Sequence, residues 1–531
     1  MNQAAAQTLF SLSDFVVVLP MILLFSVSLI PLMIKVLLGN KEINPITTLA
    51  FNLIGLIVAT GMTLALAGPK ATSFFADAVV MDDIAVWMSC LCYVIAGVAL
   101  MLSYDHVATR GRQFTEFCFL LVSSVLGMVI LIMSNDLIVT FIGLETMSLC
   151  LYILVAMSKE EILSKEASFK YFVLGSFASA IFLYGVALIY GTAGSTLLPT
   201  VAEQGARLLT SNRVFLAGVG LTILGFAFKV SVFPLHAWTP DVYTGAPTPV
   251  TAFMSTAVKT ASFVAFLRFF DAPGFADADN LLTVVMWLAV LTMTIGNVAA
   301  VMQDNFKRIL AYSSVAHSGY AMVGLIASGF GDKFEHAAPT LLFYLISYSF
   351  MTLGSFAIIG LFEKNENTIV DVRDLKGMAK RYPGLALSLT ILMLSLAGIP
   401  PTLGFFGKFL VFSAAVEQDM YWLVFWGVIN SVISVYYYLR PVVIMYMSEE
   451  EPIAIVGQRL MTRATVVGSA VVILVLGIFT SPVLRIVKGS VAGQRAAPAT
   501  SSSVKDPASE APAKQLGNRY ERSVRGSRDS G

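Results

Sequence analysis

Four ionisable side chains interrupt long apolar stretches of the sequence: Glu145, Lys229, Lys259 and Lys408. A charge near the middle of a bilayer costs on the order of a few kcal/mol, so such residues usually face a protein interior or a water-filled cavity and serve ion movement. Desolvation favours the neutral amine of a lysine, whereas a nearby carboxylate favours the ammonium. A lysine that alternately pairs and unpairs can therefore release and capture protons, and these four residues predict a proton relay.

Two of the lysines stand beside residues that interrupt a helix. Pro234 follows Lys229 closely, and Pro400-Pro401 precede Lys408. Proline removes a backbone donor and clashes with the preceding turn, and Gly398 further loosens the second segment. Carbonyl groups released at such a break can face a cavity and stabilise a cation. We expect both lysines at broken transmembrane helices.

Each of these charges also has a purely structural interpretation. Glu145 and Lys229 can form a fixed ion pair that only ties two helices together. Lys259 and Lys408 can snorkel, so that their ammonium groups reach the membrane interface. The proton-relay hypothesis is favoured because a broken helix beside a fixed ion pair is costly unless something moves.

Four further residues are secondary candidates for a proton path. His317 stands among hydroxyl residues and can pass protons through its two nitrogens near neutral pH, but it can equally be a satisfied core histidine. Lys170 lies near the start of its span, where snorkelling is as good an interpretation. Lys307 falls at a predicted membrane edge, which favours an anchor on the cytoplasmic side. His236 is expected at the cytoplasmic mouth of the helix that carries Lys229.

The composition places the chain in a lipid bilayer. Of its 531 residues, 57% are hydrophobic and only 13% are charged, and the mean hydropathy is +0.80; this is too little polar side chain to cover a soluble globule. The net charge of +1 gives no reason to expect nucleic acid. The sequence has no dinucleotide fingerprint or phosphate loop, and its cysteines lack metal-site spacing. We therefore expect no cofactor and no metal in this chain.

The apolar runs predict an all-α polytopic membrane protein. A bilayer crossing needs about 20 apolar residues, and about fourteen runs reach that length, the twelfth being long enough to hold a helix broken in the middle. The predicted spans are 14–38, 46–67, 83–103, 114–133, 136–157, 168–191, 213–236, 248–270, 281–303, 308–329, 339–362, 383–416, 421–446 and 464–488.

The loop charges predict an orientation. One set of loops carries most of the lysine and arginine residues, and it is cytoplasmic by the positive-inside rule. The other set carries only Lys70, Arg207, Arg213, Arg268 and Lys333. With an even number of spans, both termini are expected on the non-cytoplasmic side. The polar tail 489–531 has almost no large apolar residue and is predicted to be disordered.

The spans also predict an internal repeat. Spans four to eight (114–270) and nine to thirteen (281–446) each hold five helices, and the fourth member of each set carries a central lysine beside a break. A unit with an odd number of spans inserts upside down relative to its copy, which gives the inverted repeats typical of transporters. A three-helix segment (1–113) precedes the repeats, and a final helix (464–488) and the tail follow them.

Three fragments resemble a known family. Residues 166–176 read EASFKYFVLGS, residues 228–243 read FKVSVFPLHAWTPDVY, and residues 398–409 read GIPPTLGFFGKF. They resemble the antiporter-like membrane subunits of respiratory complex I, the bacterial NADH-quinone oxidoreductase, and the resemblance extends to about Lys488. Lys408 separates the chain from a subtype expected to carry glutamate there. The lack of a long lateral helix separates it from another.

The resemblance implies both a fold and a role. It implies about fourteen helices, two inverted five-helix repeats and a proton route through Glu145, Lys229, Lys259 and Lys408. Electrons would pass from NADH to quinone through FMN and iron-sulfur clusters held by other subunits, while this chain moves protons across the inner membrane. The expected partners are the other membrane and peripheral subunits, including adjacent antiporter-like subunits. The alternatives are a subunit of a multi-chain Na+/H+ antiporter and a non-conducting membrane scaffold.

Overall fold

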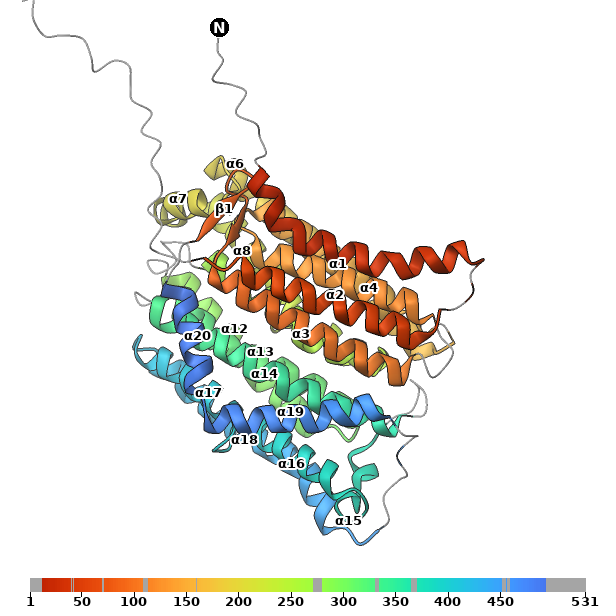
Figure 1. Ribbon diagram of the computed structural model, residues 1–531. Helices are drawn as coiled ribbons and strands as arrows, with labels where there is room; N and C mark the ends of the chain where they lie inside the picture. The colour runs from red at the N-terminus through yellow and green to blue at the C-terminus, as the bar shows by residue number, and fades with distance from the viewer. Residues whose placement is uncertain are drawn as a thin grey trace, which may run out of the picture.

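The protein is a bundle of long helices that lie side by side (Figure 1). The computed structural model describes residues 12–39, 41, 43–68, 71–107, 113–158, 160–270, 279–329, 334–363, 370–450, 455 and 459–492. Among these residues, 12 helices are long and apolar enough to cross a membrane. The prediction of an all-α polytopic membrane protein is confirmed.

Eleven of the long spans are single helices: α1 (Leu12–Leu37), α2 (Pro45–Ala65), α3 (Asp83–His106), α4 (Phe114–Met133), α5 (Leu137–Val155), α6 (Ile162–Ala193), α12 (Asp279–Val301), α13 (Phe306–Gly329), α14 (Phe334–Phe362), α18 (Tyr421–Met447) and α19 (Leu460–Ile478). The other one runs without interruption through α10 (Thr248–Phe253), the π-helical turn η2 (Met254–Val258) and α11 (Lys259–Phe270).

Both predicted helix breaks are present. In the run 213–236, α8 (Arg213–Lys229) ends in a turn, and α9 (Trp238–Gly245) begins just after the run. The run 383–416 folds as α16 (Pro383–Ala397) and α17 (Leu403–Val416), which are separated by a short irregular segment. Together with the 12 long spans, these two broken helices agree with the predicted number of about fourteen crossings.

The last predicted span, 464–488, is not a single helix. It divides into α19 and α20 (Ser481–Ala492), which meet at a steep angle (Figure 1). Pro482 explains the division, because proline has no amide hydrogen and is tolerated in a helix only in its first turn. Helix α20 continues to Ala492, into the predicted tail; residues 493–531 of that tail lie outside the described residues.

Several short elements are not evident from the apolar runs. A β-hairpin pairs β1 (Thr72–Phe74) with β2 (Val79–Met81) in antiparallel register. The amphipathic helix α7 (Leu198–Ser211) joins α6 to α8, and the 3₁₀ turn η3 (Val372–Leu375) and α15 (Met378–Arg381) precede α16. The division into two inverted repeats stays a prediction.

The bundle has a buried centre. The spanning window within 248–270 is 100% buried, and those of α13 and α14 are 94% and 89% buried, whereas that of α1 is only 28% buried. The outer helices therefore present apolar side chains to lipid, while the central three can carry polar residues that never meet it. Three of the candidate residues, Lys259, Lys307 and His317, belong to these central helices.

Small residues let neighbouring helices approach closely where the site is built. A Cβ at Gly127 of α4 would lie 2.4 Å from the Met147 nitrogen of α5, and one at Gly143 would lie 2.8 Å from the Leu131 nitrogen. Glycine at such crossings permits backbone contact between transmembrane helices. This contact fixes α5, which carries Glu145, against the interior.

We predict that Gly127→Ala destabilises the protein by about 1–3 kcal/mol, because the added methyl group has no space and the two backbones must separate. The matched control is Gly61→Ala in α2, where a Cβ would meet nothing within 4 Å. Replacing that helical glycine is expected to leave stability unchanged or raise it slightly. Thermal unfolding of the detergent-solubilised protein measures both, and equal midpoints for the two variants would contradict the packing described here.

Candidate functional site

Lys229 is the last residue of α8, at the first helix break. The helix cannot continue because Pro234 lacks an amide hydrogen and clashes with the preceding turn. The Trp238 indole donates a hydrogen bond to the Phe228 carbonyl at 3.1 Å, and this satisfies one of the acceptors that the break releases. The partial negative charge at the carboxyl end of a helix favours a cation there. The break therefore provides a position in which an ammonium is stabilised inside the bundle.

The Lys229 ammonium contacts α5 rather than the membrane surface. Lys229 is 3% exposed, and its Nζ donates to the Ser148 hydroxyl at 2.6 Å. Glu145 lies one turn earlier on α5 and accepts a hydrogen bond from the Ser179 hydroxyl of α6. No direct ion pair joins Glu145 to Lys229 within the described part of the chain. The two predicted partners are thus neighbours on facing helices without being a fixed salt bridge.

Lys259 lies at the centre of the bundle. It is 2% exposed and directly follows the π turn η2. Its Nζ donates to the hydroxyls of Ser314 at 2.6 Å and Ser318 at 2.8 Å, both on α13, and to the Ser314 carbonyl. The Tyr348 hydroxyl of α14 donates to Ser314 at 2.9 Å. The ammonium therefore points inward and does not snorkel.

His317 stands on the same helix, between the two serines that bind Lys259. Its Nδ1 lies 2.6 Å from the Tyr344 hydroxyl, and its Nε2 lies 3.0 Å from the Tyr438 hydroxyl. The Tyr438 hydroxyl also contacts the Ser313 hydroxyl at 2.5 Å. A neutral imidazole donates from one nitrogen and accepts at the other, so it can pass a proton between two hydroxyl groups. The interior histidine is both fully bonded and arranged for proton transfer.

Lys408 is held at the second helix break. It is 5% exposed, and its Nζ donates to the Ala397 carbonyl, at the end of α16, and to the Ser431 hydroxyl of α18, both at 3.1 Å. The next residue, Gly398, ends α16 with a φ of +84°, which favours glycine. The ammonium also lies 4.8 Å from the centre of the Tyr320 ring. The carboxyl end of α16 and the aromatic face both stabilise a cation here.

Polar and aromatic groups join the two lysine sites. The His317 ring lies 5.6 Å from the Tyr320 ring, which in turn faces Lys408. Tyr344, the other partner of His317, packs against Gly407, the residue before Lys408. The structure thus brings Lys259, His317 and Lys408 together along one row of hydroxyls and rings.

Lys170 and His236 lie apart from this row. Lys170 is partly exposed and forms ion pairs with Glu166 and with Asp241, the latter at 2.8 Å; Asp241 also pairs with Arg308 at 3.2 Å. The ring of His236 lies in the turn after α8, and its Nδ1 is buried with no hydrogen-bond partner among the described residues. We place neither residue in direct contact with the central lysines.

Lys307 lies at the start of α13, as expected of a residue at the membrane edge, but its side chain is buried there. It is 4% exposed, and its Nζ donates to the Ala246 carbonyl at 2.7 Å and to the Glu363 carboxylate at 3.3 Å. Glu363 directly follows α14 and draws the lysine inward. Burial raises the pKa of Glu363, but Lys307 and His106 beside it outweigh that effect and bring the pKa to about 2. Sequence reasoning missed Glu363 and His106, because each looks like an ordinary polar helix end.

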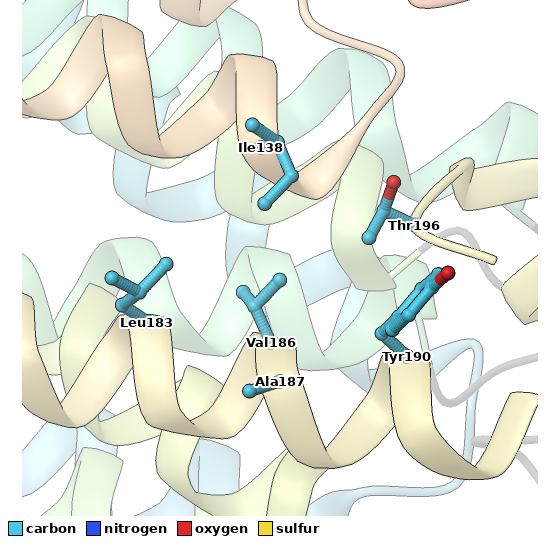
Figure 2. A pocket seen from close by; sticks show the side chains of 6 residues that line it. All are labelled: Ile138, Leu183, Val186, Ala187, Tyr190 and Thr196. Carbon is cyan, nitrogen blue, oxygen red and sulfur yellow. The ribbon is translucent and has the colours of Figure 1, made fainter. Parts of the chain in front are cut away.

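An apolar cavity lies elsewhere, between α5 and α6 (Figure 2). It has a volume of about 360 Å³, and its lining includes Ile138, Leu183, Val186, Ala187, Tyr190 and Thr196. These six side chains carry no charge. No cluster of three metal-ligating side chains occurs among the residues that the structure describes.

Comparison with known proteins gives consistent matches. Residues 134–434 match the family model described as NADH:quinone oxidoreductase/Mrp antiporter, TM. The NADH-quinone oxidoreductase subunit N of Bdellovibrio bacteriovorus is 51% identical over 90% of this chain and 98% of its own length. A chain of respiratory complex I from Thermus thermophilus is 32% identical with a TM-score of 0.75, covering 89% of this chain and 100% of that one. A chain of the Mrp complex from Dietzia sp. DQ12-45-1b has the same TM-score at 20% identity, over 91% and 97%, which shows a shared fold.

The buried lysines can be tested as structural ties. We predict that Lys408→Met leaves thermal stability unchanged or raises it, because replacing a buried charge by an apolar side chain of similar size removes a desolvation cost. The control is Arg268→Met, which breaks the two-bond pair of Arg268 with Asp82, at 2.7 and 2.8 Å. That change is expected to cost about 3–5 kcal/mol, since a carboxylate then stays buried without its partner. A large loss of stability in Lys408→Met would identify Lys408 as a structural tie.

Proposed function

The chain belongs to the NADH:quinone oxidoreductase/Mrp antiporter family of membrane subunits, and from this premise we propose that it is the proton-translocating subunit N of a bacterial NADH-quinone oxidoreductase. The relative at 51% identity carries that name and matches over almost its full length, whereas the Mrp chain at 20% identity shares the fold alone. The lysine at position 408 fits the same subtype. The observation that carries the proposal is that Lys229, Lys259 and Lys408 are all buried and that each is bonded to hydroxyl or carbonyl oxygens.

In this proposal the chain carries protons and no electrons. NADH, FMN, the iron-sulfur clusters and quinone are bound by other subunits of the complex, which supply the redox energy. The partners are those other membrane and peripheral subunits, including adjacent antiporter-like subunits, together with the lipid bilayer. The chain holds no cofactor of its own.

The first proton step depends on Glu145. Its carboxylate is one turn from Ser148, which binds the Lys229 ammonium. When the carboxylate turns toward Lys229 it favours the ammonium, and when it turns back toward Ser179 it favours release of the proton. Because the hydroxyl of Ser148 can accept from an ammonium or donate to an amine, Lys229 stays bonded in both states.

The proton then moves along the central row. Lys259 receives it and passes it through the hydroxyls of Ser314 and Ser318 toward His317. His317 and its two tyrosine partners pass it to Lys408. Release follows to the far side of the membrane. Lys170, His236 and Lys307 are the secondary members of this route.

The sidedness follows from charge and chain direction. The ends of the bundle that carry Lys35, Lys307 and Arg459 form the cytoplasmic side by the positive-inside rule. The start of α1 and helix α20 both lie at the opposite end of the bundle (Figure 1). This supports a multi-pass protein of the bacterial inner membrane with both termini on the non-cytoplasmic side.

We predict that Lys229→Met in the assembled complex lowers NADH-driven proton pumping and coupled quinone reduction, because the proton has no acceptor at the first break. A positioned acid-base group typically contributes about 10²-fold or more to a transfer step. Lys376 is partly exposed and pairs with Glu450; it supplies the control variant Lys376→Met, which is expected to pump normally. Acidification of proteoliposomes and NADH oxidation are measured together. A normal proton-to-electron ratio in Lys229→Met would remove Lys229 from the route.

Co-purification of other subunits distinguishes the proposed function from the antiporter and scaffold alternatives. Purification of the tagged chain from membranes should bring down subunits that contain flavin and iron-sulfur clusters. Recovery without them, together with Na+-dependent proton exchange, would instead support the multi-chain Na+/H+ antiporter. Full pumping by both Lys229→Met and Lys408→Met variants would support a non-conducting scaffold.

A further inference from the structure

A second group of ionisable residues lies buried at one end of the bundle, outside the lysine row. The Glu363 carboxylate accepts hydrogen bonds from Lys307 at 3.3 Å and from the Thr248 hydroxyl, which lies 2.7 Å from each of its oxygens. His106 Nε2 lies 3.3 Å from the same carboxylate. These four residues come from the ends of α3, α10, α13 and α14. Glu363 is 0% exposed and His106 is 2% exposed.

Other charged groups surround this cluster. Arg459, at the start of α19, donates to the backbone carbonyls of Glu363, at 2.9 Å, and of Gly360. Asp105, next to His106, accepts from the backbone nitrogen and the hydroxyl of Thr462, at 2.9 and 3.0 Å. Arg463 follows one turn after Arg459 on α19. Arginine stays charged at any physiological pH, so the imidazole of His106 is the group of this cluster that changes charge most readily near neutral pH.

The Glu363 carboxylate stabilises the protonated form of the His106 imidazole. Lys307 and His106 keep the pKa of Glu363 low despite its burial, so the carboxylate persists as an anion at neutral pH. An anion next to a histidine favours the protonated ring. If this cluster only held four helices together, His106 would not be needed. The bonds from Lys307 and Thr248 already satisfy both oxygens of the Glu363 carboxylate.

Polar groups lead from this cluster to Lys259 along three packed helices. On α13, Lys307, Ser314 and Ser318 repeat at helical spacing and so share one face. On α14, Tyr348 and Thr352 lie one turn apart on one face, and Glu363 directly follows the end of this helix.

Both helical faces end at the hydrogen bonds of Lys259. The serines Ser314 and Ser318 bind its ammonium, and the Tyr348 hydroxyl donates to Ser314. The Thr352 hydroxyl is buried with no hydrogen-bond partner among the described residues, and buried polar atoms normally have one. On the third helix, Thr248, Thr251 and Ser255 precede Lys259, and all three are buried.

We propose that His106, Glu363 and Lys307 form a second loading site, which takes up a proton at this end of the bundle and supplies Lys259 alongside the transfer that starts at Lys229. The proposal rests on the proposed function. A proton from water at this end binds His106 Nε2 and is held by the Glu363 carboxylate. It then moves over the hydroxyls of the packed helices to the neutral amine of Lys259, which becomes an ammonium, and His106 returns to its neutral form. No electron moves in this step.

The test is the pH profile of Glu363→Gln in the complete complex in proteoliposomes, read as NADH-driven proton pumping. The amide keeps the size of the side chain and its bond with Thr248, but it no longer favours the protonated imidazole. As pH rises, His106 therefore loses its proton earlier than in the parent. We expect near-parental pumping at about pH 6 and a loss of about fivefold or more at about pH 8. A profile that is lowered equally at every pH, or unchanged, would overturn the proposal.

Asp82→Asn is the matched control, because Asp82 is also a buried carboxylate at a helix end, bonded to Arg268 at the opposite side of the bundle. Its pH profile should keep the parental shape. If Glu363→Gln does not assemble, His106→Asn replaces it; this variant should pump slowly at every pH, and parental pumping would overturn the proposal. Full pumping by Lys229→Met would refute the proposed function itself. If Lys229→Met loses pumping while Glu363→Gln keeps the parental pH profile of pumping, only the loading site is refuted.

Discussion

An ammonium held inside a membrane protein must be hydrogen-bonded in every state that it visits, because an unbonded charge away from water costs several kcal/mol. Lys229, Lys259 and Lys408 meet this constraint with neutral acceptors: serine hydroxyls and backbone carbonyls. A hydroxyl accepts from an ammonium and can also donate to an amine. These sites therefore tolerate both protonation forms, and the helix breaks provide two of them, at Lys229 and Lys408.

The charges at the ends of the bundle obey a different rule. Arg268 pairs with Asp82, and Lys35 pairs with Glu116 at 2.7 Å, so each of these two cations has a carboxylate partner. Removing one member of such a pair leaves a buried charge, which makes the pair a structural tie. The distinction between central lysines on neutral acceptors and peripheral cations on carboxylates separates residues that can exchange protons from residues that hold helices in place. Glu363 combines the two roles. It is the carboxylate partner of the buried cation Lys307, and it also contacts His106, which can exchange a proton.

The sequence predicts the helix-break lysines well, because their signal is local. Pro234 and Pro400-Pro401 lie within a few residues of Lys229 and Lys408, and an apolar run with a charge beside a proline is readable without a structure. The number of crossings is readable for the same reason, as each span is a contiguous run. The division of the last run at Pro482 is harder to predict, because apolar residues continue on both sides of the proline.

What the sequence does not reveal is long-range pairing. His106 and Glu363 are far apart in the chain and meet only when α3 and α14 pack together. Lys307 stands beside Arg308 in the sequence, yet the first is buried against Glu363 and the second pairs with Asp241 near the surface. Adjacent helical residues point about 100° apart, so two neighbouring cations can have opposite environments. Only the packing decides which of them faces the interior.

The central claim is that buried amines bonded to neutral oxygens carry the protons that cross the membrane. It is tested most directly by counting protons pumped per NADH oxidised in proteoliposomes that contain the complete complex with Lys259→Met. This variant keeps the length of the side chain but has no group that binds a proton. The account predicts fewer protons per NADH than in the parent complex. The parental ratio at the parental rate would contradict it.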